Sequence, residues 1–273
     1  MIYFHGSFRT MEACRPVTWP AAGSFSKPEE KMRKCTSDKH QATSCDKMSR
    51  VNLSNVLFLV YVLKIDSTER YNMKITEAIK ITDSFTRTSK MPGLSYSLPA
   101  WECQTGSKLR KVPGSPCYGC YALKGNYTRY PAIKEAQYRR LKAIDHPLWV
   151  QAMAAKIKNQ KWFRWHDAGD VQSHEHMQKI IEVCKLTPDT KHWLPTQERQ
   201  YLPDPEEVPA NLVIRLSRSK IDLEAAPNAW SHDSGVTTDS TKRTCPAPNQ
   251  GGKCESCRAC WNKDIRSVIY GKH

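Results

Sequence analysis

Residues 162–196, WFRWHDAGDVQSHEHMQKIIEVCKLTPDTKHWLPT, contain the pattern that decides the fold. The short, aromatic-rich segment 162–166 is typical of a buried strand, and Ser173 is a residue type that often caps the start of a helix. Apolar residues then follow at helical spacing: Met177, Ile180, Ile181 and Cys184. A second short strand is expected at 192–194. The stretch therefore predicts a strand–helix–strand unit in which Cys184 is a core thiol.

The same alternation continues on both sides of this unit. NLVIRL at 211–216 predicts a third strand, and helices are expected after Pro131, with Ile133 on its apolar face, and after Pro147. Strands and helices that alternate at this spacing favour βαβ units. We therefore predict an α/β fold with a mostly parallel sheet, either a full or a partial (β/α) barrel, with cysteine-rich metal-binding segments.

Three parts of the chain lack such a pattern. Residues 91–125 are rich in proline and glycine, which predicts loop, and residues 227–244 are polar and irregular. Residues 1–72 contain scattered cysteines and no sustained period. We expect 1–72 to be an N-terminal extension, either disordered or upstream of a true start near Met73, and 73–273 to be a single α/β metal-binding domain.

The chain is strongly basic, with a formal net charge of +15 and a pI near 9.3. Such an excess favours polyanionic partners. The longest apolar run, 56–63, is far shorter than the ~20 residues of a spanning helix, so no membrane association is expected. No secretory signal is evident, and closely spaced cysteines in a reducing, cytoplasmic compartment favour metal ligands over disulfides.

Four of the eleven cysteines lie in the segment 245–260, CPAPNQGGKCESCRAC. Three close thiols and one remote Cys-Pro are similar to the way ferredoxin loops hold a cubane, although here the Cys-Pro precedes the trio. This spacing favours a [4Fe–4S] cluster, with zinc as the alternative, on four ligands: Cys245, Cys254, Cys257 and Cys260.

A second group consists of Cys103, Cys117 and Cys120. With iron, three cysteines leave one corner of a cluster open for a substrate or cofactor. With zinc, a histidine would close a structural site, and a water would make a reactive one. The two groups could also share sulfurs in a single site, because sequence does not fix their separation.

Basic and aromatic residues are interleaved between Cys103 and Lys142, where nine lysines and arginines accompany one acidic residue, Glu135. This composition suits a phosphate backbone with bases to stack, and a solvated surface is the alternative. The candidate phosphate-binding residues are Lys108, Arg110, Lys111, Lys124 and Arg129.

Polar residues follow the strand at 162–166. The carboxyl ends of parallel strands are where ligands bind, so His166, Asp167 and Asp170 are candidate catalytic residues. The alternative is that Asp170 only shapes a turn. Arg164 and Arg215 interrupt apolar strands, which indicates either anion binding in the interior or an exposed sheet face.

Several segments between Met91 and His273 resemble the phage gene product 88 family. They are SLPAWECQTGSKLRKVPGSPCYGCYALKG, FRWHDAGDVQS, HWLPTQE, NLVIRLS and the cysteine-rich tail. The resemblance implies a phage or prophage origin, and hence the host cytoplasm, but no reaction. CYGCYA is also similar to phage proteins grouped near radical-SAM enzymes, whose usual trio is C-x-x-x-C-x-x-C. The spacing of Cys103, Cys117 and Cys120 differs from that trio.

Two functional classes are consistent with these patterns. The first is an iron–sulfur, radical-SAM-like enzyme acting on nucleic acid or a nucleotide-derived substrate, with S-adenosylmethionine as a conceivable cofactor. The second is a zinc-stabilised nucleic-acid-binding module without catalysis. Dinucleotide, P-loop, zincin and α/β-hydrolase motifs are absent from the sequence.

Overall fold

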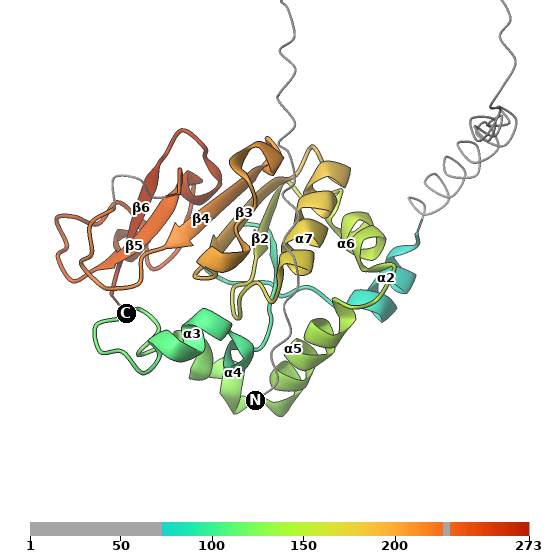
Figure 1. Cartoon of the computed structure of the whole chain (residues 1–273), viewed down its shortest axis with the longest axis horizontal. Coiled ribbons are helices and arrows are strands. Elements are labelled where there is room, and N and C mark those ends of the chain that lie inside the picture. The colour runs from blue at the N-terminus through green and yellow to red at the C-terminus, as the bar shows by residue number, and fades with distance from the viewer. Residues whose placement is uncertain (1–72, 226–229, 273) are drawn as a thin grey trace, which may run out of the picture. The chain divides into compact units, whose positions relative to one another are not determined.

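The computed structural model describes residues 73–225 and 230–272, all of which belong to one compact unit (Figure 1). The predicted N-terminal extension, 1–72, lies outside the described residues. In the described part of the chain, no helix is both long and apolar enough to cross a membrane.

Six parallel strands form one sheet, and their order in space is their order in the chain. They are β1 (Leu94–Tyr96), β2 (Trp162–Trp165), β3 (Lys191–Thr196), β4 (Leu212–Ser217), β5 (Asp233–Thr237) and β6 (Ser267–Gly271). The α/β class and the parallel sheet are therefore confirmed. Within the described residues β1 and β6 are the two edges and do not pair, so the expectation of a full barrel is not confirmed.

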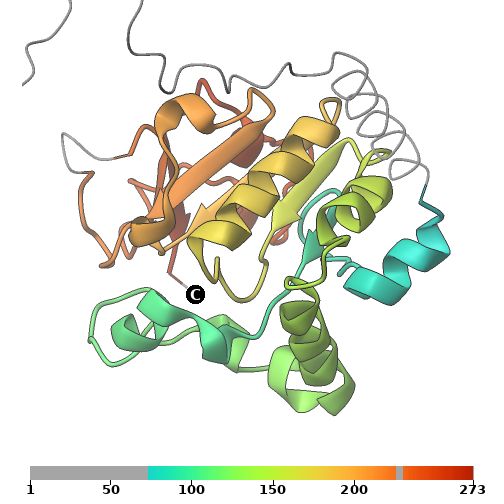
Figure 2. The same cartoon turned by 45° about the vertical axis from the view of Figure 1, so that its right-hand side comes forward.

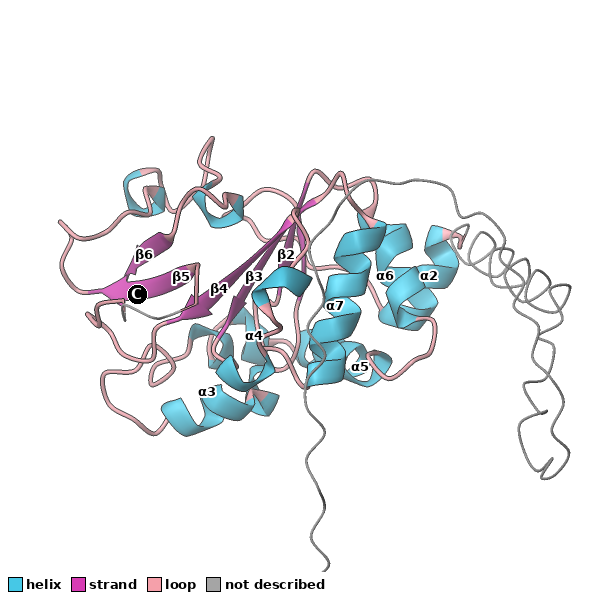
Figure 3. Cartoon of the chain, turned by 45° about the horizontal axis from the view of Figure 1, so that its top comes forward, coloured by secondary structure: helices cyan, strands magenta, loops and turns pink. Residues whose placement is uncertain are grey.

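Six α-helices accompany the sheet in the described ranges: α2 (Ile75–Thr82), α3 (Gln104–Leu109), α4 (Asn126–Arg129), α5 (Pro131–Ala143), α6 (Trp149–Ile157) and α7 (His174–Leu186). Helices α6 and α7 pack together beside β2, and α2 packs on α6 (Figure 2). Helices α3 and α4 lie beyond the ends to which the strand arrows point, so they cover the carboxyl edge of the sheet (Figure 3).

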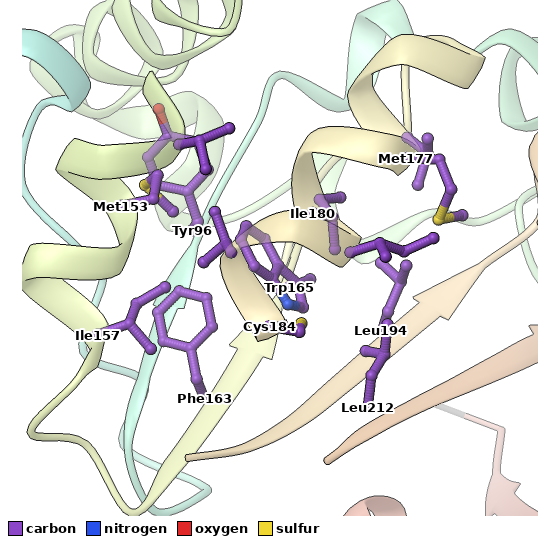
Figure 4. Packing of buried hydrophobic residues seen from close by; sticks show 14 of the residues in the cluster. Tyr96, Met153, Ile157, Phe163, Trp165, Met177, Ile180, Cys184, Leu194 and Leu212 are labelled. Atoms are coloured by element: carbon purple, nitrogen blue, oxygen red, sulfur yellow. The ribbon is translucent and has the colours of Figure 1, made fainter. Parts of the chain in front are cut away.

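The main core lies between the sheet and α7. Side chains alternate along a strand, and in β2 the residues Phe163 and Trp165 face the helices and are fully buried. They pack with Ile180 and Cys184 of α7 and with Leu194 of β3 (Figure 4). Burying such side chains stabilises the fold by roughly 1.5–3 kcal/mol each.

The opposite face of the sheet carries Trp162, Arg164 and Trp193, which alternate with the core residues. The C-terminal segment covers this face through Trp261. Its ring centroid lies 5.6 Å from that of Trp162 and 5.2 Å from that of Trp193, and its indole N–H donates to the Phe163 carbonyl at 2.9 Å. The cysteine-rich tail is thus held against the side of the sheet away from α7.

The three predicted strands and the helix at 174–186 are confirmed, and Ser173 accepts the predicted capping bond from the His176 amide at 3.0 Å. Cys184 is buried as expected. The helix at 131–143 is also confirmed, but its predicted apolar face is wrong at Ile133, which is 37% exposed; Gln137 and Arg140 are buried instead.

Three strands were not predicted. β1 lies in the segment assigned to loop, and β5, DSGVT, lies in the segment assigned as irregular. β6 follows directly on the cysteine tail. Each is only 3–5 residues long, so none offers an apolar run or an alternation long enough to recognise.

Candidate metal centres

Cys103, Cys117 and Cys120, here called the edge group, lie at the carboxyl edge of the sheet. Cys103 is the N-cap residue of α3. A β-carbon placed on Gly106 would lie 3.7 Å from the sulfur of Cys103 and 3.9 Å from that of Cys117, so both sulfurs face the same glycine. The absence of a side chain at Gly106 therefore lets these two thiols approach each other.

Glu198, which follows β3, holds the edge group in place. Its carboxylate accepts from the Thr105 amide at 2.8 Å and from the Thr105 hydroxyl at 2.6 Å. Glu198 is fully buried, and a negative charge at the start of α3 is favourable. The carboxylate ties the cysteine loop after β1 to the end of β3.

Asp167 fixes the other half of the loop. The hydroxyls of Ser95 and Ser97 donate to one of its carboxylate oxygens at 2.5 and 2.7 Å, and Tyr127 donates to the other at 2.8 Å. The Tyr121 hydroxyl donates to its main-chain carbonyl at 2.5 Å. Asp167 is 1% exposed and both carboxylate oxygens have donors, so these contacts give it a positioning role; its predicted catalytic role stays a prediction.

Asp170 is also enclosed. One carboxylate oxygen accepts from the Val171 amide at 2.8 Å and the Thr196 hydroxyl at 2.6 Å, and the other accepts from the Gln197 amide at 2.8 Å. Burial raises the pKa of Asp170 to about 7, against the lowering effect of these hydrogen bonds. The side chain is therefore close to the ionised–neutral midpoint at neutral pH. Both of its carboxylate oxygens have donors, as in Asp167, and its predicted catalytic role stays a prediction.

The edge group is electrostatically unfavourable to thiolates when nothing positive is bound. Burial raises the pKa of Cys103, and the charges of Asp170, Cys120 and Cys117 raise it further. Burial and the neighbouring Cys120 raise the pKa of Cys117 to about 11. Cations reverse this balance because a coordinating thiol is deprotonated.

His166 ends β2 with a left-handed backbone, φ 54°. Its Nδ1 lies 3.1 Å from the Tyr96 carbonyl and must donate to it, which leaves Nε2 as an acceptor; this atom is buried and has no partner within the described residues. Burial lowers the pKa of His166 to about 4, so the ring is neutral. The ring centroid of His176 lies 5.3 Å away. No contact joins His166 to the cysteines.

The second set, Cys245, Cys254, Cys257 and Cys260, is here called the face group because its segment lies on the sheet face away from α7. Arg215 of β4 holds this segment through hydrogen bonds to its main chain. The fully buried guanidinium donates to six main-chain carbonyls at 2.9–3.3 Å: Asp233, Ala259, Cys260, Asn262, Ile265 and Arg266. Of the two predicted alternatives, an exposed sheet face is therefore wrong for Arg215.

Further contacts order the face group. The amide of Cys254 donates to the Lys90 carbonyl at 2.7 Å, and the amide of Cys257 donates to the Cys254 carbonyl at 2.8 Å. The sulfur of Cys260 lies 3.2 Å from the Tyr270 hydroxyl. Burial raises the pKa of Cys260 to about 11, against the lowering effects of Tyr270 and Arg215.

The two groups are separate. The thiols whose charges raise the pKa of Cys103 and Cys117 belong to the edge group. The thiols whose charges raise the pKa of Cys254 and Cys260 belong to the face group. All eight described cysteines are unpaired. Within residues 73–225 and 230–272, no three His, Cys, Asp or Glu side chains are arranged closely enough to hold a metal ion in this structure. Metal binding would require the thiols to turn toward a common centre.

The predicted phosphate-binding residues surround the edge group. Lys108, Lys111, Lys124 and Arg129 are exposed and Arg110 is partly exposed; none of the five forms an ion pair with another described residue. Tyr118 is 59% exposed and Tyr130 is 50% exposed. A groove of about 470 Å³ runs along α5, lined by Lys134, Glu135, Tyr138, Arg139 and Lys142.

Sequence reasoning missed several residues that build these sites. Glu198 is one: its position just past a predicted strand was the available signal, the same signal that singled out Asp167 and Asp170. Ser95, Ser97 and Tyr127 had no such signal, because the strand before them was not recognised. The carbonyl partners of Arg215 are up to 51 residues distant in sequence and could not be foreseen.

An open parallel α/β sheet with one cysteine group at its carboxyl edge and another on the face away from α7 defines a cysteine-rich α/β protein. The sequence profile of the family described as Gene product 88 matches residues 67–263. The chain therefore belongs to the gene product 88 family of phage proteins, which confirms the resemblance. No curated protein and no solved structure matches the chain.

Proposed function

We propose that this protein is a metalloenzyme whose edge group holds a [4Fe–4S] cluster and whose substrate is nucleic acid or derived from a nucleotide. The observation that carries the proposal is the proximity of Cys103, Cys117 and Cys120 at the carboxyl edge of a parallel sheet, where each lies close enough to affect the pKa of another, beside the buried carboxylates of Asp170 and Glu198. Ligands of parallel α/β proteins bind at this edge.

The donor set fits such a group. Three thiols supply three of the four cysteine positions of a cluster, and the fourth corner would be left for a substrate or for a cofactor such as S-adenosylmethionine. When bound, the cluster would supply one-electron chemistry. Asp170, with a pKa of about 7, is the residue that we expect to hold or move a proton beside it.

We interpret the sheet as part of a (β/α) barrel. Parallel strands that lie in chain order are the arrangement of an opened barrel, in which active residues come from the loops after several strands. Here the contributions come from the loop after β1 (the edge group), after β2 (Asp167, Asp170) and after β3 (Glu198). The face group would hold a second centre, structural or electron-transferring.

The basic surface supports the choice of substrate. Unpaired cations and exposed tyrosines around the edge group suit a phosphate backbone whose bases can stack. The same observation favours a second candidate, a zinc-stabilised nucleic-acid-binding module in which both cysteine groups are structural.

The metal content of the full chain, purified without oxygen, tests the proposal. We expect a coloured protein with about four iron and four sulfide for each cluster. The double variant Cys117→Ala/Cys120→Ala should lose one cluster, whereas Cys184→Ala, which removes a core thiol outside both groups, should keep all of them. A colourless protein with zinc would favour the binding module, and a protein without metal would overturn both proposals.

Binding of a labelled single-stranded oligonucleotide tests the substrate class. We expect the affinity to fall steeply with salt, and the double variant Lys108→Gln/Lys111→Gln to bind more weakly than the wild type. The same charge loss at the opposite, amino-terminal ends of β2 and β3, Lys161→Gln/Lys191→Gln, should have a smaller effect. Equal loss in both variants, or no binding at low salt, would contradict a role of this surface.

A further inference from the structure

Arg164 and Arg215 occupy neighbouring parts of the same sheet face, yet their surroundings differ. Arg215 has all its donor atoms on carbonyls, as described above. Arg164 has two long contacts only: one terminal nitrogen is 3.8 Å from the Met91 sulfur, and the other is 3.5 Å from the Tyr121 hydroxyl. Neither is a strong hydrogen bond, because thioether sulfur is a weak acceptor and 3.5 Å is long.

The Arg164 guanidinium is short of acceptors. Its Nε is buried and has no partner within the described part of the chain. The nearby carboxylate, Asp167, has both oxygens occupied by the hydroxyls of Ser95, Ser97 and Tyr127. A buried donor without an acceptor is costly, and on a cationic group it favours an anion as the partner.

The geometry keeps the guanidinium fixed. Its central carbon lies 4.6 Å from the centroid of the Trp193 ring, a cation–π contact, and the Trp193 ring in turn packs edge-on against Trp261. A guanidinium held in place presents its paired N–H donors in one direction, which is the arrangement that binds carboxylate or phosphate with two hydrogen bonds.

Arg164 is only partly buried. Tyr121 is 51% exposed as a residue, while its hydroxyl, which neighbours the outer nitrogen of Arg164, donates to the Asp167 carbonyl. Arg258 lies 5.5 Å from the centroid of the Trp162 ring on the same face, and Arg215 lies further along it. Burial raises the pKa of Cys254 and Cys260 and the charge of Arg164 lowers it, so an anion bound here would share the guanidinium with these face-group thiols.

We infer that Arg164 is the binding site of an oxyanion, the carboxylate or phosphate end of a small molecule, between the edge group and the face group. The inference does not depend on a metal, because it rests on the unpartnered Nε, the contact with Trp193 and the partial exposure of Arg164. Such a site would hold the anionic end of a substrate beside the carboxyl edge of the sheet.

Phosphorus NMR of inorganic phosphate, titrated with the full chain at constant ionic strength in chloride, tests the inference. We expect the phosphate signal to broaden, and Arg164→Gln to weaken the affinity for phosphate about tenfold or more. Arg164→Lys should weaken it less, because lysine keeps the charge but loses the paired donors. Arg87→Gln, which removes an exposed arginine elsewhere, should leave the binding unchanged. Acetate should displace phosphate if a carboxylate uses the same donors, and failure to displace it would assign the site to phosphate.

Two results would overturn the inference. Equal broadening in wild type, Arg164→Gln and Arg87→Gln would show that phosphate collects on the basic surface in general. Loss of bound metal in Arg164→Gln, with phosphate binding unchanged, would make Arg164 a counter-ion of the face-group thiolates instead. The unfolding midpoint of each variant should be measured too, and Arg164→Lys keeps the test valid if Arg164→Gln does not fold.

Discussion

The edge group and the face group use similar residues in different settings. The edge group depends on side chains: two carboxylates, Glu198 and Asp167, hold its loop to the ends of β2 and β3. The face group depends on main-chain carbonyls that converge on one cation, Arg215. The first arrangement places three thiols and a titratable carboxylate at the carboxyl edge of the sheet, whereas the second fastens four thiols to the sheet face away from α7. The difference favours a reactive role for the first and a structural or electron-transferring role for the second.

Acid should produce the largest difference in stability between the two regions. Burial lowers the pKa of His166 to about 4, of His192 to about 3, and of His176 well below its ordinary value. The unfolded chain binds these protons first, so the stability is complete above pH ~6.5 and is lost as the pH falls toward ~4. Each histidine should cost on the order of 2 kcal/mol at pH 5.

Hydrogen exchange at pH 7.5 and pH 5 measures this difference. Residues 160–177, which contain His166 and His176, should lose protection in acid before residues 259–268. The latter are held by Arg215, which stays charged over this pH range. In urea unfolding, His192→Gln should lose about 2 kcal/mol less unfolding free energy between pH 7.5 and pH 5 than the wild type, which is the contribution of one histidine. Simultaneous loss of protection in both regions would contradict the separation.

Replacing Arg215 should break the face group. Arg215→Met leaves six carbonyls without their donor, and we expect a loss of about 4 kcal/mol of unfolding free energy. Arg215→Lys, which keeps the charge but not the fork, should lose less. Urea unfolding gives the change, and Arg87→Gln is the control. A loss below about 1 kcal/mol would show that the carbonyl contacts are not what fixes the tail.

Glu198→Gln should loosen only the edge group. The amide keeps one acceptor for Thr105 but removes the charge at the start of α3, so we expect a loss of about 1–2 kcal/mol. Hydrogen exchange should become faster at residues 103–110 and stay unchanged in β4. Faster exchange in the face-group segment as well would mean that the two regions depend on each other.

The smallest effect on stability is expected at Gly106. A methyl group there would lie 2.9 Å from the Cβ of Cys103, so Gly106→Ala should move that residue and lower the metal content of the edge group. Gly119→Ala is a matched control in the same loop, because its β-carbon would meet nothing within 4 Å. Equal metal content in the two variants would contradict a role for the close approach of Cys103 and Cys117.

How far sequence predicts this structure depends on whether a signal is local. The unit at 162–196 was predictable because a buried strand, a capped helix and a helical stripe each follow one period. The separation into two cysteine groups was not, because it depends on how far apart the sheet places two loops. Arg215 illustrates the limit. The sequence shows an arginine in an apolar strand, but its carbonyl partners, such as those of Ile265 and Arg266, lie about 50 residues further along the chain.

Both groups consist of cysteines, so residue type alone does not decide which group leaves an iron free to take a ligand, and one measurement addresses that directly. It is the electron paramagnetic resonance spectrum of the reduced, anaerobically purified chain, recorded with and without added imidazole. The variant Cys254→Ala/Cys257→Ala isolates the edge group, and Cys117→Ala/Cys120→Ala isolates the face group. We predict that imidazole changes the spectrum of the edge group only, because three thiols leave one iron free to take a ligand. A change at the face group alone, or at neither, would contradict the assignment of the edge group as the reactive centre.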